Sequence, residues 1–121
     1  MQYLLMIHVQ ESGWDQLTTE QQAAGVKAYA DFTQSIQDSK NYVGGNRLTP
    51  SNSGTLVRVR EGKKLVTDGP YAEAKEQIGG YYLIEAKNLD EAIAIAAKCP
   101  GAHHGTVEVR PIATMAQARP A

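Results

Sequence analysis

The sequence lacks the features that several classes of protein require. Its single cysteine cannot form an internal disulfide or supply a zinc site with several thiolates, so nothing points to an oxidising compartment. Twelve Lys and Arg residues face thirteen Asp and Glu residues, which leaves no positive excess for the phosphate contacts that dominate nucleic-acid binding. The first apolar run ends before His8 and has no basic segment or cleavage site around it. We therefore expect a cytoplasmic protein with no signal peptide, no membrane span and no nucleic-acid partner.

The composition is that of one globular domain. Hydrophobic residues occupy 42 % of the 121 positions. A chain of this length buries roughly 65 % of its unfolded surface, so its core needs neither a disulfide nor a metal. No repeat or low-complexity tract divides the sequence. We expect one domain over residues 1–112 and a tail over residues 113–121 that is either poorly ordered or lies across a partner subunit.

Alternating apolar residues predict the strands. Residues 2–9 are apolar on both faces, which is typical of a central strand. The further predicted strands, in chain order, are residues 42–48, 55–60, 64–67, 80–86 and 106–112. The second and third of these form a hairpin that turns at Glu61 and Gly62. The glycine pairs at 44–45 and 79–80 lack the context of a phosphate-binding loop and are expected to form bulges or bends.

Two helices are predicted from capping signals and from apolar residues spaced three and four apart. The first begins at Thr18 or Thr19, where a glutamine three residues later completes a capping box, and ends near Ser39. The second follows Asn88, and its predicted apolar stripe consists of Leu89, Ala92, Ile93, Ala96 and Cys99. Because Cys99 continues this stripe, we expect it to pack in the core rather than act as a nucleophile.

The order strand, helix, strand, hairpin, strand, helix, strand predicts an α+β fold: a ferredoxin-like βαββαβ domain with an inserted β-hairpin. Two helices cover only one face of such a sheet. Either Leu4 and Met6, or Tyr3, Leu5 and Ile7, must lie on the uncovered face. We expect a second copy of the sheet to cover it in a homodimer, forming a dimeric α+β barrel. The alternative is a monomer whose open face is polar.

Residues 68–80 form the densest polar segment. Asp68-Gly69-Pro70 is a turn sequence, in which Asp68 or Gly69 would cap a short helix that Pro70 begins. In one interpretation, the Asp68 carboxylate only satisfies backbone N–H groups. In the other, it faces a cleft as part of a catalytic group of acids and bases, namely Asp68, Glu73, Lys75 and Glu76.

The histidines offer two further candidates for proton transfer. His8 ends the first strand, either as a satisfied core or interface residue or as a catalytic group facing the cavity of a two-sheet barrel. His103 and His104 are adjacent, and neighbours in a strand point to opposite faces, so we expect no metal site. Beside a carboxylate, His104 is a candidate general base.

Charged residues on the strands also allow two interpretations. Arg58 and Arg60 share a strand face, as do Glu108 and Arg110, and cross-strand ion pairs at a solvent-facing edge would explain them. Alternatively, Arg47 or Arg110 lies in the cavity and anchors an anionic small molecule.

The polar segment continues as Asp68-Gly69-Pro70-Tyr71-x-Glu73-x-Lys75-Glu76-x-Ile78-Gly79-Gly80-Tyr81-Tyr82. Together with Cys99-Pro100 and residues 105–111, it resembles the DGPF-type branch of the YCII-related proteins. The resemblance extends over most of the chain. It implies a ferredoxin-like fold and a dimeric α+β barrel, although a fold does not determine function.

In the wider family, enzymatic activity has been suspected from a histidine on the first helix and an aspartate before a proline near the end of the second. Tyr29 and Cys99 occupy these positions here. The resemblance also implies a gene context beside extracytoplasmic-function sigma factors, and distant relatives that are isomerases, lyases and monooxygenases.

Two functional hypotheses follow. The first is a cofactor-independent lyase or isomerase that moves a proton on a small molecule, using the cluster of residues 68–76 with His8 or His104. Its ligand-binding candidates are Arg47, Tyr29, Tyr82 and Arg110. The second is a non-catalytic module that binds a small ligand or a partner linked to a sigma factor. Neither hypothesis requires a cofactor or a metal.

Overall fold

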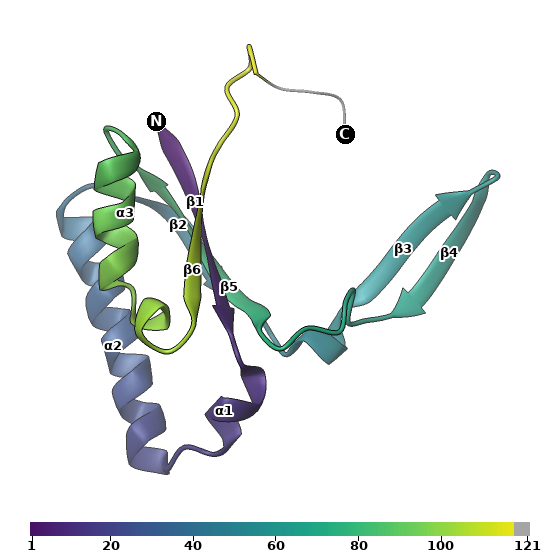
Figure 1. Ribbon diagram of the computed structural model, residues 1–121, viewed down its shortest axis with the longest axis horizontal. Coiled ribbons are helices and arrows are strands. Elements are labelled where there is room, and N and C mark those ends of the chain that lie inside the picture. Colours follow the sequence, from purple (N-terminus) through teal and green to yellow (C-terminus); the bar gives the residue numbers. More distant parts are fainter. Residues whose placement is uncertain (118–121) are drawn as a thin grey trace.

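The computed structural model describes residues 1–117, so the last four residues of the expected tail, 118–121, lie outside the described part. Two helices cover one face of a four-stranded sheet, and a two-stranded hairpin extends away from it (Figure 1). The elements are β1 (Gln2–Val9), α1 (Glu11–Asp15), α2 (Thr19–Asp38), β2 (Tyr42–Arg47), η1 (Ser51–Ser53), β3 (Thr55–Arg60), β4 (Lys63–Asp68), β5 (Gln77–Glu85), α3 (Leu89–Lys98), η2 (Pro100–His103) and β6 (Thr106–Pro111).

The main sheet has the strand order β2-β5-β1-β6, and all three pairings are antiparallel. This is the α+β arrangement expected for a ferredoxin-like domain, with β1 in a central position. The register shifts once between β2 and β5, after Tyr42, and once between β1 and β5, between Ile7 and His8. These irregularities lie beside the two glycine pairs and confirm the predicted bulges.

The helices begin where the sequence predicts. The Thr18 side chain accepts a hydrogen bond from the Gln21 N–H and the Gln21 side chain accepts one from the Thr18 N–H, which completes the capping box of α2. Asn88 caps α3 by accepting from the Glu91 N–H at 2.9 Å. Helix α1 has no predicted counterpart, because five residues are too few to show a helical repeat.

The apolar side chains of β1 that face the helices form the centre of the core. Tyr3, Leu5 and Ile7 are 2 %, 0 % and 5 % exposed. Around them pack Phe32, Ile36, Ile84, Ala86, Ala92, Ile95, Ala96 and Cys99. Leu4 and Met6 therefore lie on the opposite face of the sheet, which no helix of this chain covers.

The predicted stripe of α3 is wrong in part. Leu89 and Ile93 are 47 % and 51 % exposed, whereas Ile95 is buried. The buried residues Ala92, Ile95, Ala96 and Cys99 share one side of the helix, and Cys99 lies in the core as predicted. The helix is therefore rotated relative to the prediction, so that Ile95 and not Ile93 packs on the sheet.

Two expectations for the polar segment and the hairpin are also wrong. Pro70 does not begin a helical turn, and Asp68 is the last residue of β4, so neither Asp68 nor Gly69 caps a helix there. Arg58 and Arg60 do not face acidic residues, because the tight turn at Glu61 and Gly62 places them opposite Leu65 and Lys63.

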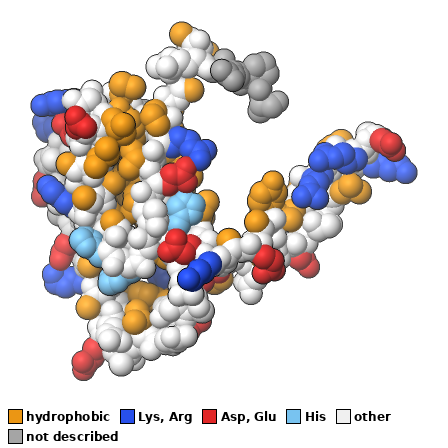
Figure 2. All heavy atoms as spheres, in the orientation of Figure 1, with side chains coloured by type: hydrophobic (Ala, Val, Ile, Leu, Met, Phe, Trp, Pro, Cys, Tyr) orange, Lys and Arg blue, Asp and Glu red, His pale blue; other side chains and the backbone are white. Residues whose placement is uncertain are grey.

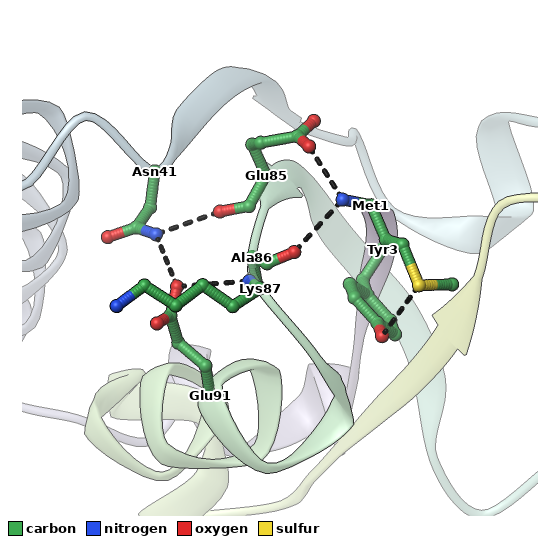
Figure 3. A network of polar contacts seen from close by, with 7 residues as sticks. All are labelled: Met1, Tyr3, Asn41, Glu85, Ala86, Lys87 and Glu91. Atoms are coloured by element: carbon green, nitrogen blue, oxygen red, sulfur yellow. Dashed lines mark hydrogen bonds and ion pairs between the residues drawn. The ribbon is translucent and has the colours of Figure 1, made fainter.

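A network of polar contacts joins the sheet to α3 at the end where β1 begins (Figure 3). The Asn41 side chain donates to the Glu85 carbonyl at 2.8 Å and to the Glu91 carboxylate at 3.1 Å. The N-terminal ammonium of Met1 donates to Glu85 Oε1 at 2.7 Å. This end of the sheet is thus held by β1, β5 and α3, and the candidate site lies at the other end. No helix among residues 1–117 is long and apolar enough to cross a membrane.

Candidate functional site

The uncovered face of the sheet is apolar at its centre. We call it the open face and define it by Leu4 and Met6 of β1 with Ile78, Tyr81 and Leu83 of β5. Leu4 lies opposite Leu83, and Met6 lies opposite Tyr81. The four central side chains are half-buried, and Ile78 is 43 % exposed. The charged side chains of β6 border this apolar centre along one side of the sheet.

His8 and Glu108 form an acid–base contact at the edge of the open face. The Nε2–H of His8 donates to Glu108 Oε1 at 3.0 Å. His8 ends β1 and lies opposite Thr106, while Glu108 lies opposite Met6, so the contact runs diagonally between neighbouring strands. The two side chains are 26 % and 36 % exposed. A bond through Nε2 leaves Nδ1 of the neutral ring as the proton acceptor.

Arg110 holds the other oxygen of the Glu108 carboxylate. Its guanidinium donates to Glu108 Oε2 from the same strand face, two residues along β6. The hydrogen bonds from Arg110 and then from His8 lower the pKa of Glu108 below its ordinary value. Glu108 is therefore ionised at neutral pH and is oriented by two partners. The ion pair of Glu108 with Arg110 lies within β6 and is not the predicted cross-strand pair, whereas the contact of Glu108 with His8 does cross between strands.

This lowered pKa predicts a pH-dependent contribution to stability. Ionised Glu108 stabilises the folded state above its ordinary pKa, and the stabilisation is lost as the pH falls through the lower folded value. In Arg110→Gln the Glu108 pKa should rise toward its ordinary value, because its strongest hydrogen-bond donor is gone. A carboxyl-carbon NMR titration of Glu108 in both proteins measures this. An identical midpoint in the two proteins would contradict the role assigned to Arg110.

A second group of polar residues lies at the same end of the sheet. Gln10, Lys75, Glu76 and His104 line a surface hollow of about 390 Å³. A Cβ atom at Gly105 would collide with the His8 carbonyl oxygen and would lie 3.3 Å from Glu76 Oε2, so this loop passes tightly between the two. Of the predicted cluster, the structure thus places Lys75 and Glu76 in one hollow with His104, and Glu76 on the other side of the Gly105 loop from the His8 backbone.

The other members of the predicted cluster lie elsewhere. Asp68 is exposed at the end of β4 and pairs across the hairpin with Thr55. Glu73 is exposed in the irregular segment before β5. Neither residue lines the hollow. The chain separates these carboxylates because residues 69–76 adopt no helical turn that could place positions 73 and 76 on one face.

Tyr29 and Tyr82 lie on the helix side of the sheet, away from the open face. Tyr82 packs edge-on against Phe32 with ring centroids 5.2 Å apart, and its hydroxyl is 2.7 Å from Thr33 Oγ1. Burial raises the pKa of Tyr29 to about 12, and contact with Cys99 adds to the shift. Burial likewise raises the pKa of the Cys99 thiol. These groups are protonated at neutral pH and form a packed layer between α2 and the sheet.

Arg47 contacts an aromatic ring instead of joining the site. Its guanidinium carbon lies 5.1 Å from the centroid of the Trp14 ring, in cation–π geometry. Trp14 belongs to α1, and its ring also lies 3.3 Å from the position of a Cβ at Gly25. The pair therefore joins α1 to α2 and to the end of β2.

Sequence reasoning names His8 and Arg110 as candidates but does not name Glu108 as the contact of His8. The contact could be predicted from the positions of His8 and Glu108 on neighbouring antiparallel strands. That prediction requires the order of the strands and the register of β1 with β6. Among the residues that the structure describes, no group of three or more His, Cys, Asp or Glu side chains could hold a metal ion.

Comparison with known proteins places these features in a wider context. The sequence profile of the YCII-related domain matches residues 1–116. An uncharacterized protein of Rhizobium meliloti (strain 1021) is 44 % identical over 69 residues, which cover 55 % of this chain and 56 % of the relative. The chain thus aligns with a little over half the length of this curated relative. The profile match includes the main sheet, both long helices and the hairpin.

Proposed function

The chain belongs to the YCII-related family, and we propose that it is a cytoplasmic homodimer that moves a proton on a small molecule without a cofactor. The reaction class is that of a lyase or isomerase. The observation that carries the proposal is the 3.0 Å contact between His8 Nε2 and Glu108 Oε1 beside the open face. The Asp68-Gly69-Pro70 sequence supports placing the chain in the DGPF-type branch of the family.

The His8–Glu108 pair has the parts of a general base. Glu108 accepts the Nε2–H and so fixes the tautomer in which Nδ1 carries the lone pair. When Nδ1 takes a proton from the substrate, the ionised carboxylate stabilises the imidazolium that forms. Arg110 keeps that carboxylate in place and ionised, so we assign it a positioning role.

A second copy would complete the site. In one chain, the apolar centre of the open face is only half-buried, and His8 lies at its edge. Two such faces packed as sheets about 10 Å apart would remove this surface from water and leave His8 at the mouth of the space between them. Exclusion of water there would strengthen the electrostatic contacts of the pair.

The surroundings of His8 suit a small molecule with an apolar body and a carbonyl group. Leu4, Met6 and Leu83 offer apolar contact, while Lys75 supplies positive charge for the oxyanion that forms when a proton leaves the carbon next to a carbonyl. In this proposal, Glu76 and His104 contribute to the wall of the hollow. Asp68 and Glu73 have no part in the proton transfer.

The test measures proton abstraction without requiring the complete reaction. Small ketones, keto acids and aromatic carbonyl compounds are incubated with the protein in D₂O, and exchange of the C–H next to the carbonyl is followed by proton NMR. We expect at least one compound to exchange faster with the protein. His8→Gln should lower that rate by about 10²-fold, and Glu108→Gln by about tenfold, because each removes part of the base.

His103→Gln is the matched control. Its ring contacts the Ala97 carbonyl at 3.0 Å on the helix side of the molecule, so the exchange rate should not change. Exchange that persists in His8→Gln, or that falls equally in His103→Gln, would overturn the assignment of the base.

A non-catalytic ligand-binding role is the second candidate, and a specific observation favours it. Asp68 and Glu73, which the enzyme hypothesis groups with Glu76, are exposed and lie outside the hollow. Compounds that raise the melting temperature of both wild type and His8→Gln, with no exchange in either, would identify a binding module. A partner linked to an extracytoplasmic-function sigma factor would then be the context to investigate.

A further inference from the structure

The hairpin of β3 and β4 stands apart from the rest of its own chain. We call residues 55–68 the arm. In Figure 1 it extends from one end of the sheet, on the side away from α2 and α3, which is the side of the open face. At its base the Gly69 N–H donates to the Gly54 carbonyl at 2.7 Å. A two-stranded hairpin without other support is marginally stable in water, so this arm needs a covering surface.

The two faces of the arm differ in character. Val57 and Val66 lie directly opposite one another, and Val59 follows on the same face. These three side chains, which we call the valine face, are 61 %, 55 % and 61 % exposed. Lys64 lies opposite Val59 on this face, and the other face carries Arg58, Arg60 and Lys63 beside Leu56 and Leu65. Apolar and basic side chains along the arm are visible in Figure 2. Three exposed valines grouped on one face of a strand pair form an apolar surface that a partner can cover.

The charges of the arm favour a second copy of this chain as that surface. The arm holds four of the twelve Lys and Arg residues but two of the thirteen Asp and Glu residues, which gives it a net charge of +2. The remainder of the chain then has a net charge of −3. An arm placed on another copy therefore meets a body of opposite charge, which favours association.

The length of the arm is also sufficient. Its six-residue strands, at a rise of about 3.3 Å per residue, extend about 20 Å, whereas packed sheets lie about 10 Å apart. An arm that leaves on the side of the open face is thus long enough to cross the spacing between two packed sheets and reach the second copy.

We propose that each arm clasps the second copy of the chain, with the valine face packed on the partner. This inference rests on the homodimer of the proposed function and adds a second contact region to it. Two clasping arms would close the open face from its ends, beside the His8–Glu108 pair, and so the site would be incomplete in a single chain.

The test compares substitutions on the two faces of the arm. Val57→Thr/Val59→Thr keeps the branched shape and the strand preference of valine but replaces one methyl group of each side chain by a hydroxyl group. We expect the dissociation constant of the dimer, measured by sedimentation, to rise about tenfold or more. Leu65→Thr is the control on the opposite face of the arm and should change the dissociation constant of the dimer by less than about twofold.

Backbone hydrogen exchange distinguishes a failure of the proposed clasp from a failure of the proposed dimer. In the wild type, exchange of the arm amides should slow as protein concentration rises through the dissociation constant. If a dimer forms while the arm exchanges at a constant rate and the double variant dissociates normally, the clasp is wrong and the dimer stands. That outcome would leave the valine face for another partner. If no dimer forms at any concentration, both the clasp and the proposed dimer fail.

Discussion

Replacing Leu83 by lysine should convert the proposed dimer into a monomer. Leu83 lies on β5 at the centre of the open face, opposite Leu4 and Gly44, and no acidic side chain lies directly opposite it. In a twofold-symmetric interface the new ammonium group would be buried twice without a partner. We expect the dissociation constant to rise by about 10³-fold or more, measured by light scattering after size-exclusion chromatography.

Ile93→Lys provides the matched control for this prediction. Ile93 is 51 % exposed on α3, which covers the opposite side of the sheet. The same substitution there should leave the dimer intact. If Leu83→Lys remained dimeric, or if both variants dissociated alike, the open face would not be the interface.

The second large effect is expected at Leu5. Its side chain is 0 % exposed and packs between β5, β6 and the helices, so Leu5→Ala would leave a cavity that the rigid sheet cannot close. We expect the free energy of unfolding to fall by about 3 kcal/mol, a large share of the stability of a domain of this size. Urea denaturation in the Leu83→Lys background measures this without a contribution from dissociation.

Leu4→Ala is the same substitution on the open-face side of β1, and its effect on the free energy of unfolding is compared with that of Leu5→Ala. Leu4 is half-buried in the single chain, so its truncation in the monomeric background should cost about 1 kcal/mol or less. In the otherwise unchanged chain it should also weaken the dimer. Equal losses at both positions in the monomeric background would show that both faces of the sheet are covered alike within one chain, and the open face would then need no partner.

Much of the fold follows from local signals in the sequence. The capping residues Thr18 and Asn88 determine where the long helices begin, and the alternation in residues 2–9 identifies a central strand. What the alternation leaves open is which face of β1 packs on the helices, because both faces are apolar. The structure resolves this with Leu5 buried and Leu4 only half-buried.

The candidate site is harder to predict because it depends on contacts between distant segments. His8 and Glu108 are one hundred positions apart, and only the register of β1 with β6 brings them to 3.0 Å. The carboxylates of residues 68–76 are close in sequence, which favours a cluster. The irregular backbone of residues 69–76 before β5 separates Asp68 from Glu76. Closeness in sequence is thus a poor guide to which side chains share a site where the backbone is irregular. Residues far apart in sequence come into contact where the register of a sheet aligns them.

The central claim is that a second copy of the chain covers the open face. Sedimentation equilibrium of the unmodified protein at micromolar concentrations tests it most directly. We predict a mass twice the 13.1 kDa of one chain. A mass of 13.1 kDa throughout that range would contradict the claim, and with it the enclosed site at His8 and Glu108.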